Sequence, residues 1–330
     1  MIGVQCAGSE GSGSHDSGFL DRGRWQLSVG YRKQLSHRHY VGTVEQKIRA
    51  EQGTEIVNDI HLFDVALTYA VTRRFNLSVG IPLQIAKRTR PGQLDRLRGI
   101  ENAPDQVFHS TGIGDISIMG RIWLLRPPSE SGQNVSFGIG LKLPTGKADV
   151  TDTVMTAKGP VTSVVDQSIQ LGDGGWGIPL EVQAYKRIKK TTLYASGTYL
   201  INPRDTNGVQ TGRSRPSEAI MSVSDQYLAR IGFSRPVPKT RRFAYTLGWR
   251  IEGVPVRDLI GKSNGFRRPG YAMSWEPGVQ YFRARDTWSV AVPVAMRRNR
   301  KRSVSDILVG GAGDAAFADY IITVGYSHRF

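Results

Sequence analysis

The chain has 330 residues, 38 glycines, 16 prolines and a formal net charge of +16 at pH 7. Glycine and proline are spread along the whole chain, which argues against a linker and predicts a single domain. The basic clusters fall between predicted strands rather than along one helix or sheet face, so the charge pattern argues against nucleic acid as a partner. The single cysteine, Cys6, excludes an internal disulfide and a zinc site built from paired cysteines.

Residues 1–23 contain no predicted strand, and we expect a flexible leader ahead of one domain at residues 24–330. The first six residues lack the basic segment and apolar core of a secretory signal. A remnant of a cleavage region is one hypothesis, and a cytoplasmic protein is the alternative. No apolar run reaches the roughly 18 residues that a membrane-spanning helix needs, so this chain can cross a membrane only as a closed barrel of strands.

Apolar and polar residues alternate along most of the chain. The clearest case is residues 75–86, where every second side chain from Phe75 to Ile85 is apolar. Such a strand has one apolar face, and about 9 to 12 residues suffice for a tilted strand to cross an outer membrane. A soluble β-sandwich also alternates in this way. The sequence predicts twelve strands, at residues 24–35, 56–71, 75–86, 113–125, 134–143, 176–187, 191–201, 226–234, 242–253, 272–283, 286–297 and 319–330.

The lengths of the connections distinguish a sandwich from a barrel. Short connections are centred on Arg73, Pro128, Lys189, Pro238 and Ala284. Long ones alternate with them and cover residues 36–55, 87–112, 144–175, 202–225, 254–271 and 298–318. This asymmetry is typical of outer-membrane barrels, which have short periplasmic turns and long extracellular loops. The predicted fold is therefore all-β, an up-and-down antiparallel transmembrane barrel of about 12 strands in a bacterial outer membrane.

The last eight residues resemble the C-terminal assembly signal of bacterial outer-membrane barrels. Thr323, Gly325, His328 and Phe330 occupy its four specified positions, and only His328 departs from the expected residue type. The resemblance implies the barrel-assembly machinery as a partner. A soluble β protein that ends on a strand is the competing interpretation of these residues alone.

Aromatic residues near the ends of the predicted strands add support. Amphipathic rings settle at the two interfaces of a membrane, whereas the alternative for each ring is ordinary core packing. The candidates for such girdles are Trp25, Tyr31, Tyr69, Phe75, Trp123, Tyr199, Phe243, Tyr281, Trp288, Tyr320 and Phe330.

Three glycine-rich segments, TGIGD at 111–115, GLKLPTG at 140–146 and LGDGGWG at 171–177, adjoin predicted strands. Their glycines permit tight passages between loop and strand, and Pro144 ends backbone pairing. Together with the C-terminal strand, they resemble the outer-membrane barrel family named for the MetA pathway of phenol degradation, over most of the chain from about Arg24. The resemblance implies an outer-membrane location, a barrel and uptake of small apolar or aromatic compounds. It transfers no binding residue.

Catalytic and metal-binding motifs fail on spacing. The segments 145–147 and 261–263 end like phosphate loops, but Leu141 and Val256 stand where the leading glycine belongs. No HExxH sequence occurs and no nucleophile elbow of the GxSxG type is predicted, and the closest histidine neighbours are only the pair at positions 37 and 39. We therefore predict no enzyme, no metal and no cofactor. A membrane-embedded lipid hydrolase that uses His328 is a minor alternative.

The face opposite the apolar stripe is the better candidate for function. Inward charges either line a water-filled channel or pair across the lumen and close it, and the sequence leaves both open. Four acidic and four basic residues are predicted to line this lumen: Asp64, Arg121, Lys142, Glu181, Arg230, Arg250, Glu252 and Glu276.

Prolines and basic loops offer two further predictions. Pro82, Pro179, Pro277 and Pro293 lie inside predicted strands, where they cannot donate a ladder hydrogen bond, and they predict bulges or openings in the wall. The basic loop clusters, such as those from Lys87 to Arg98 and from Arg297 to Arg302, either bind lipopolysaccharide phosphates or form a solvated rim. Outer-membrane lipids and a small-molecule solute are the other expected partners.

These observations predict an outer-membrane channel or transporter for the passive passage of small solutes, with apolar or aromatic compounds as candidates. The main alternative is a structural or adhesive surface barrel.

Overall fold

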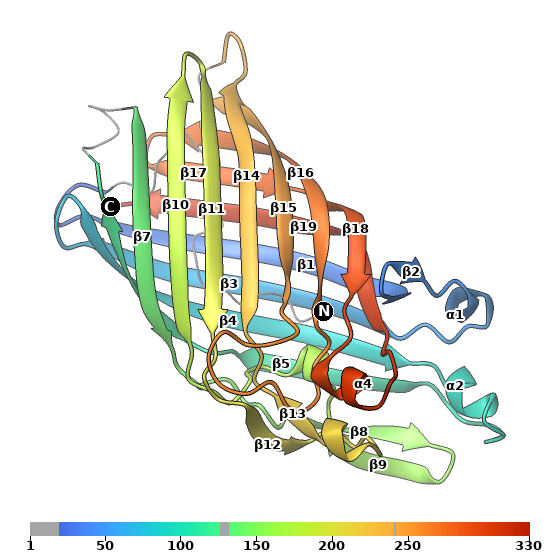
Figure 1. The fold of residues 1–330 in the computed structure, drawn as a ribbon. Helices are drawn as coiled ribbons and strands as arrows, with labels where there is room; N and C mark the ends of the chain where they lie inside the picture. The colour runs from blue at the N-terminus through green and yellow to red at the C-terminus, as the bar shows by residue number, and fades with distance from the viewer. Residues whose placement is uncertain (1–19, 126–131, 241) are drawn as a thin grey trace.

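The computed structural model of the protein describes residues 20–125, 132–240 and 242–330. Most of the predicted leader, with Cys6, and the predicted turn around Pro128 lie outside the described residues. The described chain forms a closed antiparallel barrel of 12 strands, which confirms the predicted all-β class and the strand count (Figure 1). None of the described helices has the length and apolar character needed to cross a membrane.

The barrel strands follow one another around the wall in chain order. They are β1 (Trp25–Val41), β3 (Val57–Ala70), β4 (Phe75–Arg90), β5 (Gln106–Ile113) with β6 (Ser117–Trp123), β7 (Gln133–Lys142), β10 (Ile178–Ile188), β11 (Thr191–Ile201), β14 (Gln226–Pro236), β15 (Phe243–Val254), β16 (Gly270–Arg283), β17 (Asp286–Ala291) with β18 (Val294–Arg300), and β19 (Ala315–Arg329). The last strand pairs with the first, with Gly325 opposite Gly30, and this pairing closes the barrel.

Short and long connections gather at opposite ends of the barrel, as Figure 1 shows. The turn between β10 and β11 consists of Lys189 and Lys190, and Lys189 has a left-handed φ of 54°. The remaining elements belong to the long loops: β2 (Val44–Glu45), α1 (Ile48–Glu51), α2 (Gln93–Arg96), β8 (Thr151–Thr156), β9 (Gly159–Val164), η1 (Gln167–Ile169), β12 (Thr206–Gln210), η2 (Pro216–Glu218), β13 (Ile220–Ser222) and α4 (Val304–Leu308).

Some strands extend further at the loop end than the alternation predicts. β4 continues to Arg90 and pairs with β5, so part of the segment 87–112, which the pattern assigns to a loop, is a hairpin. The outward apolar stripe of β4 ends at Ile85. Beyond that point a strand needs no apolar outer face, and alternation therefore does not reveal it.

The barrel is apolar outside and polar inside. On β4, the outward side chains Leu77, Ile81 and Ile85 are 42%, 37% and 51% exposed, whereas the inward side chains of Asn76 and Gln84 are 2% and 5% exposed. Soluble monomers rarely expose a continuous apolar band, and lipid tails cover such a band in a membrane barrel. The outer surface therefore suits a lipid environment.

Aromatic side chains pair near the short-turn end of the barrel. Neighbouring strands contribute one ring each, which gives the arrangement expected of an interfacial girdle. The ring centroids are 4.5 Å apart for Trp25 and Tyr69, 4.9 Å for Phe243 and Tyr281, and 4.3 Å for Trp288 and Tyr326.

The girdle prediction is wrong for Trp123, which is 2% exposed and points inward. The break between β5 and β6 explains the error. Ile113, before the break, is 50% exposed, whereas Ile118 and Ile122, after it, are 37% and 47% exposed. The outward side therefore moves from odd to even positions across the break, and Trp123 falls on the inner face.

Prolines account for both interruptions of the wall. Pro82 of β4 lies opposite the break between β5 and β6, where it has no N–H to donate and only its carbonyl pairs, accepting from Gly114 N at 2.8 Å. Pro293 separates β17 from β18, and Pro277 faces the same break from β16. Pro179 differs, because it lies within the unbroken β10.

Candidate functional site

Charged side chains of β14, β15 and β16 form one network on the inner face. Arg250 donates to Glu252 at 2.7 Å and lies 3.4 Å from Glu276. Arg230 also pairs with Glu276. Arg32 of β1 donates to Glu252 at 3.0 Å. Since β16, the β17–β18 strand and β19 separate β15 from β1 along the wall, this last ion pair crosses the lumen.

Burial makes these ion pairs obligatory. The side chains of Arg250 and Glu276 are each 2% exposed, and an unpaired charge in such a place costs several kcal/mol. Arg32 was not predicted to face the lumen, although it stands in the inward phase of β1, between Gly30 and the buried Gln34. The same alternation that selected its partners identifies it.

Three other predicted lumen residues lie elsewhere on the inner wall. Arg121 of β6 makes two hydrogen bonds to Glu181 of β10, of 2.8 and 2.7 Å. Only β7 lies between these strands, so this pair follows the wall. Asp64 of β3 lines a cavity of about 40 Å³ together with Arg230 and Arg250. That volume holds only a few water molecules.

The three glycine-rich segments of the family resemblance meet at the break between β5 and β6. Lys142 of the second segment pairs with Asp173 of the third and lies 3.4 Å from Asp115 of the first. Asp115 also accepts a hydrogen bond from Gly146 N at 2.9 Å. The Lys142 and Asp115 side chains are 5% and 2% exposed. These contacts give Lys142 a structural role in the wall, beside the predicted one in the lumen.

The loop between β7 and β10 turns into the barrel. Its Val165 and Ile169 are fully buried and pack on Ile60 of β3 and Ala86 of β4. Gln84 Nε2 donates to the carbonyl of Ile169 at 3.0 Å. We call residues 165–170 the inward segment. The alternation assigned it to an extracellular loop, but its apolar side chains are buried against the inner wall.

The inward segment is also tied to the opposite side of the mouth. Asp166 accepts two hydrogen bonds from Arg268, of 2.8 and 2.6 Å, and Arg88 lies 3.4 Å from the same carboxylate. Burial opposes ionisation of Asp166, but Arg268 and Arg88 outweigh it and hold the pKa well below its usual range. The inward segment thus bridges and narrows the lumen.

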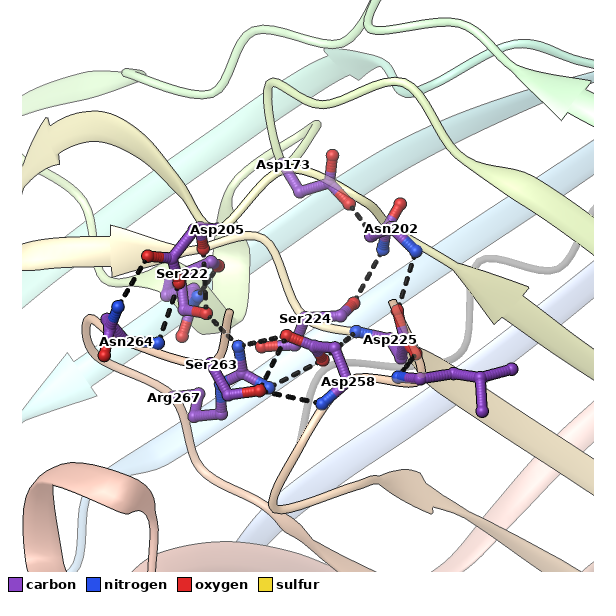
Figure 2. A network of polar contacts seen from close by, with 12 residues as sticks. Asp173, Asn202, Asp205, Ser222, Ser224, Asp225, Asp258, Ser263, Asn264 and Arg267 are labelled. Atoms are coloured by element: carbon purple, nitrogen blue, oxygen red, sulfur yellow. Dashed lines mark hydrogen bonds and ion pairs between the residues drawn. The ribbon is translucent and has the colours of Figure 1, made fainter. Parts of the chain in front are cut away.

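A second polar network fixes the loops after β11 and β15 to each other (Figure 2). Arg267, which is 1% exposed, donates to both oxygens of Asp258 at 2.7 and 2.6 Å and to Ser222 at 2.5 Å. Asp225 accepts from Asn202 N at 2.7 Å and from a second amide, in the loop after β15, at 2.8 Å. The network fixes the backbone on both sides of Arg267. This stretch of backbone carries residues that line the mouth of the barrel.

A cavity of about 950 Å³ opens at the loop end of the barrel. Its wall comes from the ends of β1, β3, β4 and β18, from the loops that contain α1 and α2, from Ser168 of the inward segment, and from the loops before β13, β16 and β19. Two acidic side chains line it, Glu218 and Asp314. The sequence indicated two basic loop clusters that contribute to this site, but it did not group them with the other lining residues, because loops have no periodicity. Seven arginines line the cavity: Arg49, Arg88, Arg98, Arg213, Arg215, Arg268 and Arg300.

The histidines of the described ranges lie beside carboxylates. His328 Nδ1 lies 2.7 Å from Asp286, and Tyr326 donates to the same carboxylate at 2.8 Å. No serine hydroxyl in the described ranges bonds to His328. His39 lies 3.0 Å from Asp314. Within the part of the chain that the structure describes, no group of three or more His, Cys, Asp or Glu residues is arranged to hold a metal ion.

The residues of the predicted assembly signal lie at the seam of the barrel. Gly325 of β19 pairs with β1, Thr323 Oγ1 donates to the neighbouring strand β17 at 3.0 Å, and His328 pairs with both strands. Phe330, which follows β19, donates its N–H to the carbonyl of Trp25 at 2.9 Å. Recognition of these residues by the assembly machinery stays a prediction.

Comparison with known proteins gives likeness in fold. No family model matches the chain, and no curated protein matches its sequence. It is similar to the solved structure of an outer-membrane channel from Pseudomonas putida F1, with 13% identity, a TM-score of 0.62, and coverage of 94% of this chain and 97% of that one. More distant are the β domain of the Bordetella autotransporter BrkA (11% identity, TM-score 0.46, 94% and 100% covered) and the toluene transporter TbuX of Ralstonia pickettii (11%, 0.45, 94% and 90%). The chain therefore has the fold of an outer-membrane β-barrel.

Proposed function

We propose that this protein is an outer-membrane channel for the passive passage of small solutes, with aromatic compounds as its candidates. The observation that carries the proposal is the structure of the lumen. A barrel with an apolar outer face encloses a polar interior, with a cavity of about 950 Å³ at the loop end and a buried Arg–Glu network deeper inside. An adhesive barrel needs outer loops but no such interior. The resemblance to the MetA-pathway family and the likeness to the Pseudomonas putida channel support the proposal.

Two constrictions determine how a solute passes. The inward segment narrows the mouth, and the Arg32–Glu252 pair crosses the lumen below it. Buried charge pairs lose much of their stabilisation if they separate without replacement partners. Polar or charged groups of a solute, or water, replace those partners during passage. The channel is therefore narrow and selective rather than a wide porin.

Single-channel conductance of the refolded protein in a planar bilayer tests this function. A salt gradient reports ion selectivity, and aromatic solutes serve as blockers. We expect small discrete steps whose selectivity changes when Arg230→Gln removes a lumen charge, but not when Arg285→Gln removes an exposed charge on the turn between β16 and β17. A correctly folded barrel that stays silent overturns the channel.

A further inference from the structure

The arginines of the mouth cavity outnumber the carboxylates around them. Asp166 is shared by Arg88 and Arg268, at 3.4 and 2.6 Å. Asp306 pairs with Arg300 at 3.1 Å. Both carboxylates lie behind the cavity surface, so they neutralise the wall without occupying the space in front of it.

The other two carboxylates face the cavity. Asp314 pairs with Arg49 at 2.6 Å, whereas Glu218 stands 3.7 Å from Arg213 and 3.5 Å from Arg215. Four carboxylates therefore lie beside six of the seven guanidinium groups that line the cavity. The excess positive charge attracts anions from solution.

Two guanidinium groups retain donors for a ligand. Arg213 is 39% exposed, and its nearest carboxylate, Glu218, lies beyond hydrogen-bond distance. The exposed Arg98 has no hydrogen bond or ion pair to its side chain within the described residues. A guanidinium offers five N–H donors in a fixed plane, which matches the two oxygens of a carboxylate.

Contacts of Arg213 hold its guanidinium in place. Its central carbon lies 3.8 Å from the ring centre of Phe266, and that of Arg268 lies 4.7 Å from the same ring. Burial, together with the nearby positive charge of Arg268, lowers the pKa of Arg213. An anion in the cavity relieves both effects, because it compensates the lost hydration and the repulsion.

The cavity also has an apolar side. Ile48 and Leu97 line it and are 51% and 57% exposed, and Leu94 lies on the same wall. An inorganic anion leaves these side chains in water. A ligand with an apolar body covers them while its charged end reaches the arginines.

The position of the cavity favours a solute over a lipid headgroup. Asn58 and Arg88, which project inward from β3 and β4, form part of its wall. The cavity therefore opens inside the barrel mouth, whereas lipopolysaccharide packs against the outside of the barrel.

We propose that this mouth cavity is a binding site for small carboxylates with an apolar or aromatic body, held through Arg98 and Arg213. The carboxylate accepts hydrogen bonds from the two guanidinium groups, and the body lies against Ile48 and Leu97. The inference adds a class of ligand to the proposed function. It rests on that function only where it concerns transport of the ligand, because binding at the mouth is measured separately.

Isothermal titration of the refolded protein in detergent tests the ligand class. Benzoate is the probe, benzamide is its neutral counterpart, acetate lacks the ring, and inorganic phosphate lacks any apolar body. We expect saturable benzoate binding and at least tenfold weaker binding of the other three. Equal binding of benzoate and benzamide overturns the role of the arginines. Tighter binding of phosphate, or of lipopolysaccharide added as a separate arm, overturns the proposed class of ligand.

Variants test the position. Arg98→Gln combined with Arg213→Gln is expected to weaken benzoate binding at least tenfold, whereas Arg285→Gln, the same charge loss at the opposite end, leaves it unchanged. Heat-modifiable migration in a gel confirms folding. If the double variant does not fold, Arg98→Gln alone tests the site, since this exposed side chain has no hydrogen-bond or ion-pair partner to lose within the described residues. This single variant is expected to weaken benzoate binding severalfold. Unchanged binding overturns the site.

Conductance separates the two proposals. A barrel that binds benzoate and stays silent in a bilayer retains the binding site and overturns the channel. A barrel that conducts but binds benzoate no better than benzamide retains the channel and overturns the binding site.

Discussion

At the scale of single residues, one ion pair that joins distant strands crosses the lumen of the proposed channel. Arg32 and Glu252 lie 3.0 Å apart across the lumen, with side chains 11% and 8% exposed. Glu252 also binds Arg250, so it remains neutralised if Arg32 is removed. Arg32 is therefore the member of the network whose loss changes the lumen most and the packing least.

We expect Arg32→Gln to increase single-channel conductance, because the shorter, uncharged side chain no longer spans the lumen to Glu252. The variant also shifts selectivity toward cations, since one positive charge leaves the path. Planar-bilayer recordings measure both quantities, with Arg285→Gln as the control. Conductance equal to that of the wild type contradicts a constriction at this pair.

Acid sensitivity at the mouth follows from Asp314. Burial opposes its ionisation, but the hydrogen bond from His39 and the charges of His39, Arg49 and Arg268 outweigh it and lower its pKa to about 2. A carboxyl with a depressed pKa stabilises the fold above its ordinary pKa near 3.8 and loses that contribution as the pH falls through about 2. The contribution is about 2 kcal/mol.

We expect the segment around Arg49 to resist pepsin at pH 4 in the wild type and to become susceptible near pH 2. Asp314→Asn removes the charge at both values, so the variant is expected to be cleaved already at pH 4. Mass spectrometry of the fragments locates the cleavage. Equal resistance of the two proteins at pH 4 contradicts the role of Asp314.

At the scale of elements, the inward segment acts as a partial plug fixed on two sides. Val165 and Ile169 bury their side chains against the β3–β4 wall, and Asp166 binds Arg268 across the mouth. The ion pair of Asp166 lies between the two buried apolar side chains, and both kinds of contact hold the same short segment, so loss of either loosens it.

Ile169→Ala is expected to release the inward segment, because shortening a fully buried side chain costs about 2–5 kcal/mol. Conductance and the frequency of open events are expected to rise while the barrel stays folded. Ile139→Ala is the matched control, since Ile139 faces outward and is 62% exposed. The same rise in both variants, or in neither, contradicts the plug.

At the scale of the whole molecule, lipid takes the place of a hydrophobic core. The barrel buries polar side chains in its lumen and presents apolar ones outside, and only a bilayer or detergent covers that outer band. The aromatic pairs near the short turns mark one edge of the band. Stability is therefore a joint property of the protein and its lipid.

We expect Ile81→Arg, in the middle of the outward stripe of β4, to destabilise the barrel by about 2–4 kcal/mol in lipid vesicles, as charge on the lipid face does. Val71→Arg, on the turn between β3 and β4, is expected to be nearly neutral. Urea unfolding in vesicles measures both. A neutral effect of Ile81→Arg contradicts burial of this face in lipid.

The candidate site was predictable only where the residues lie in regular strands. Alternation placed Arg250, Glu252 and Glu276 on one face, and the same rule, applied to β1, adds Arg32. Arg98 was assigned to a basic loop cluster, but Arg213 and its place beside Arg98 in one cavity were missed, because loop residues separated by more than a hundred positions share no periodic relation. The predicted position of Trp123 was wrong because the strand break shifts the alternation by one residue, and amino-acid composition does not reveal such a shift.

The sequence by itself determined the class, number and order of the strands, since period-two alternation encodes which face meets lipid and the loop lengths encode an up-and-down path. Only the tertiary structure decided what fills the lumen. Closure of the barrel brings Arg32 of β1 within ion-pair distance of Glu252 of β15. Burial against the inner wall places Ile169 inside the barrel. Such contacts depend on curvature and on the third dimension, which local patterns of residues do not specify.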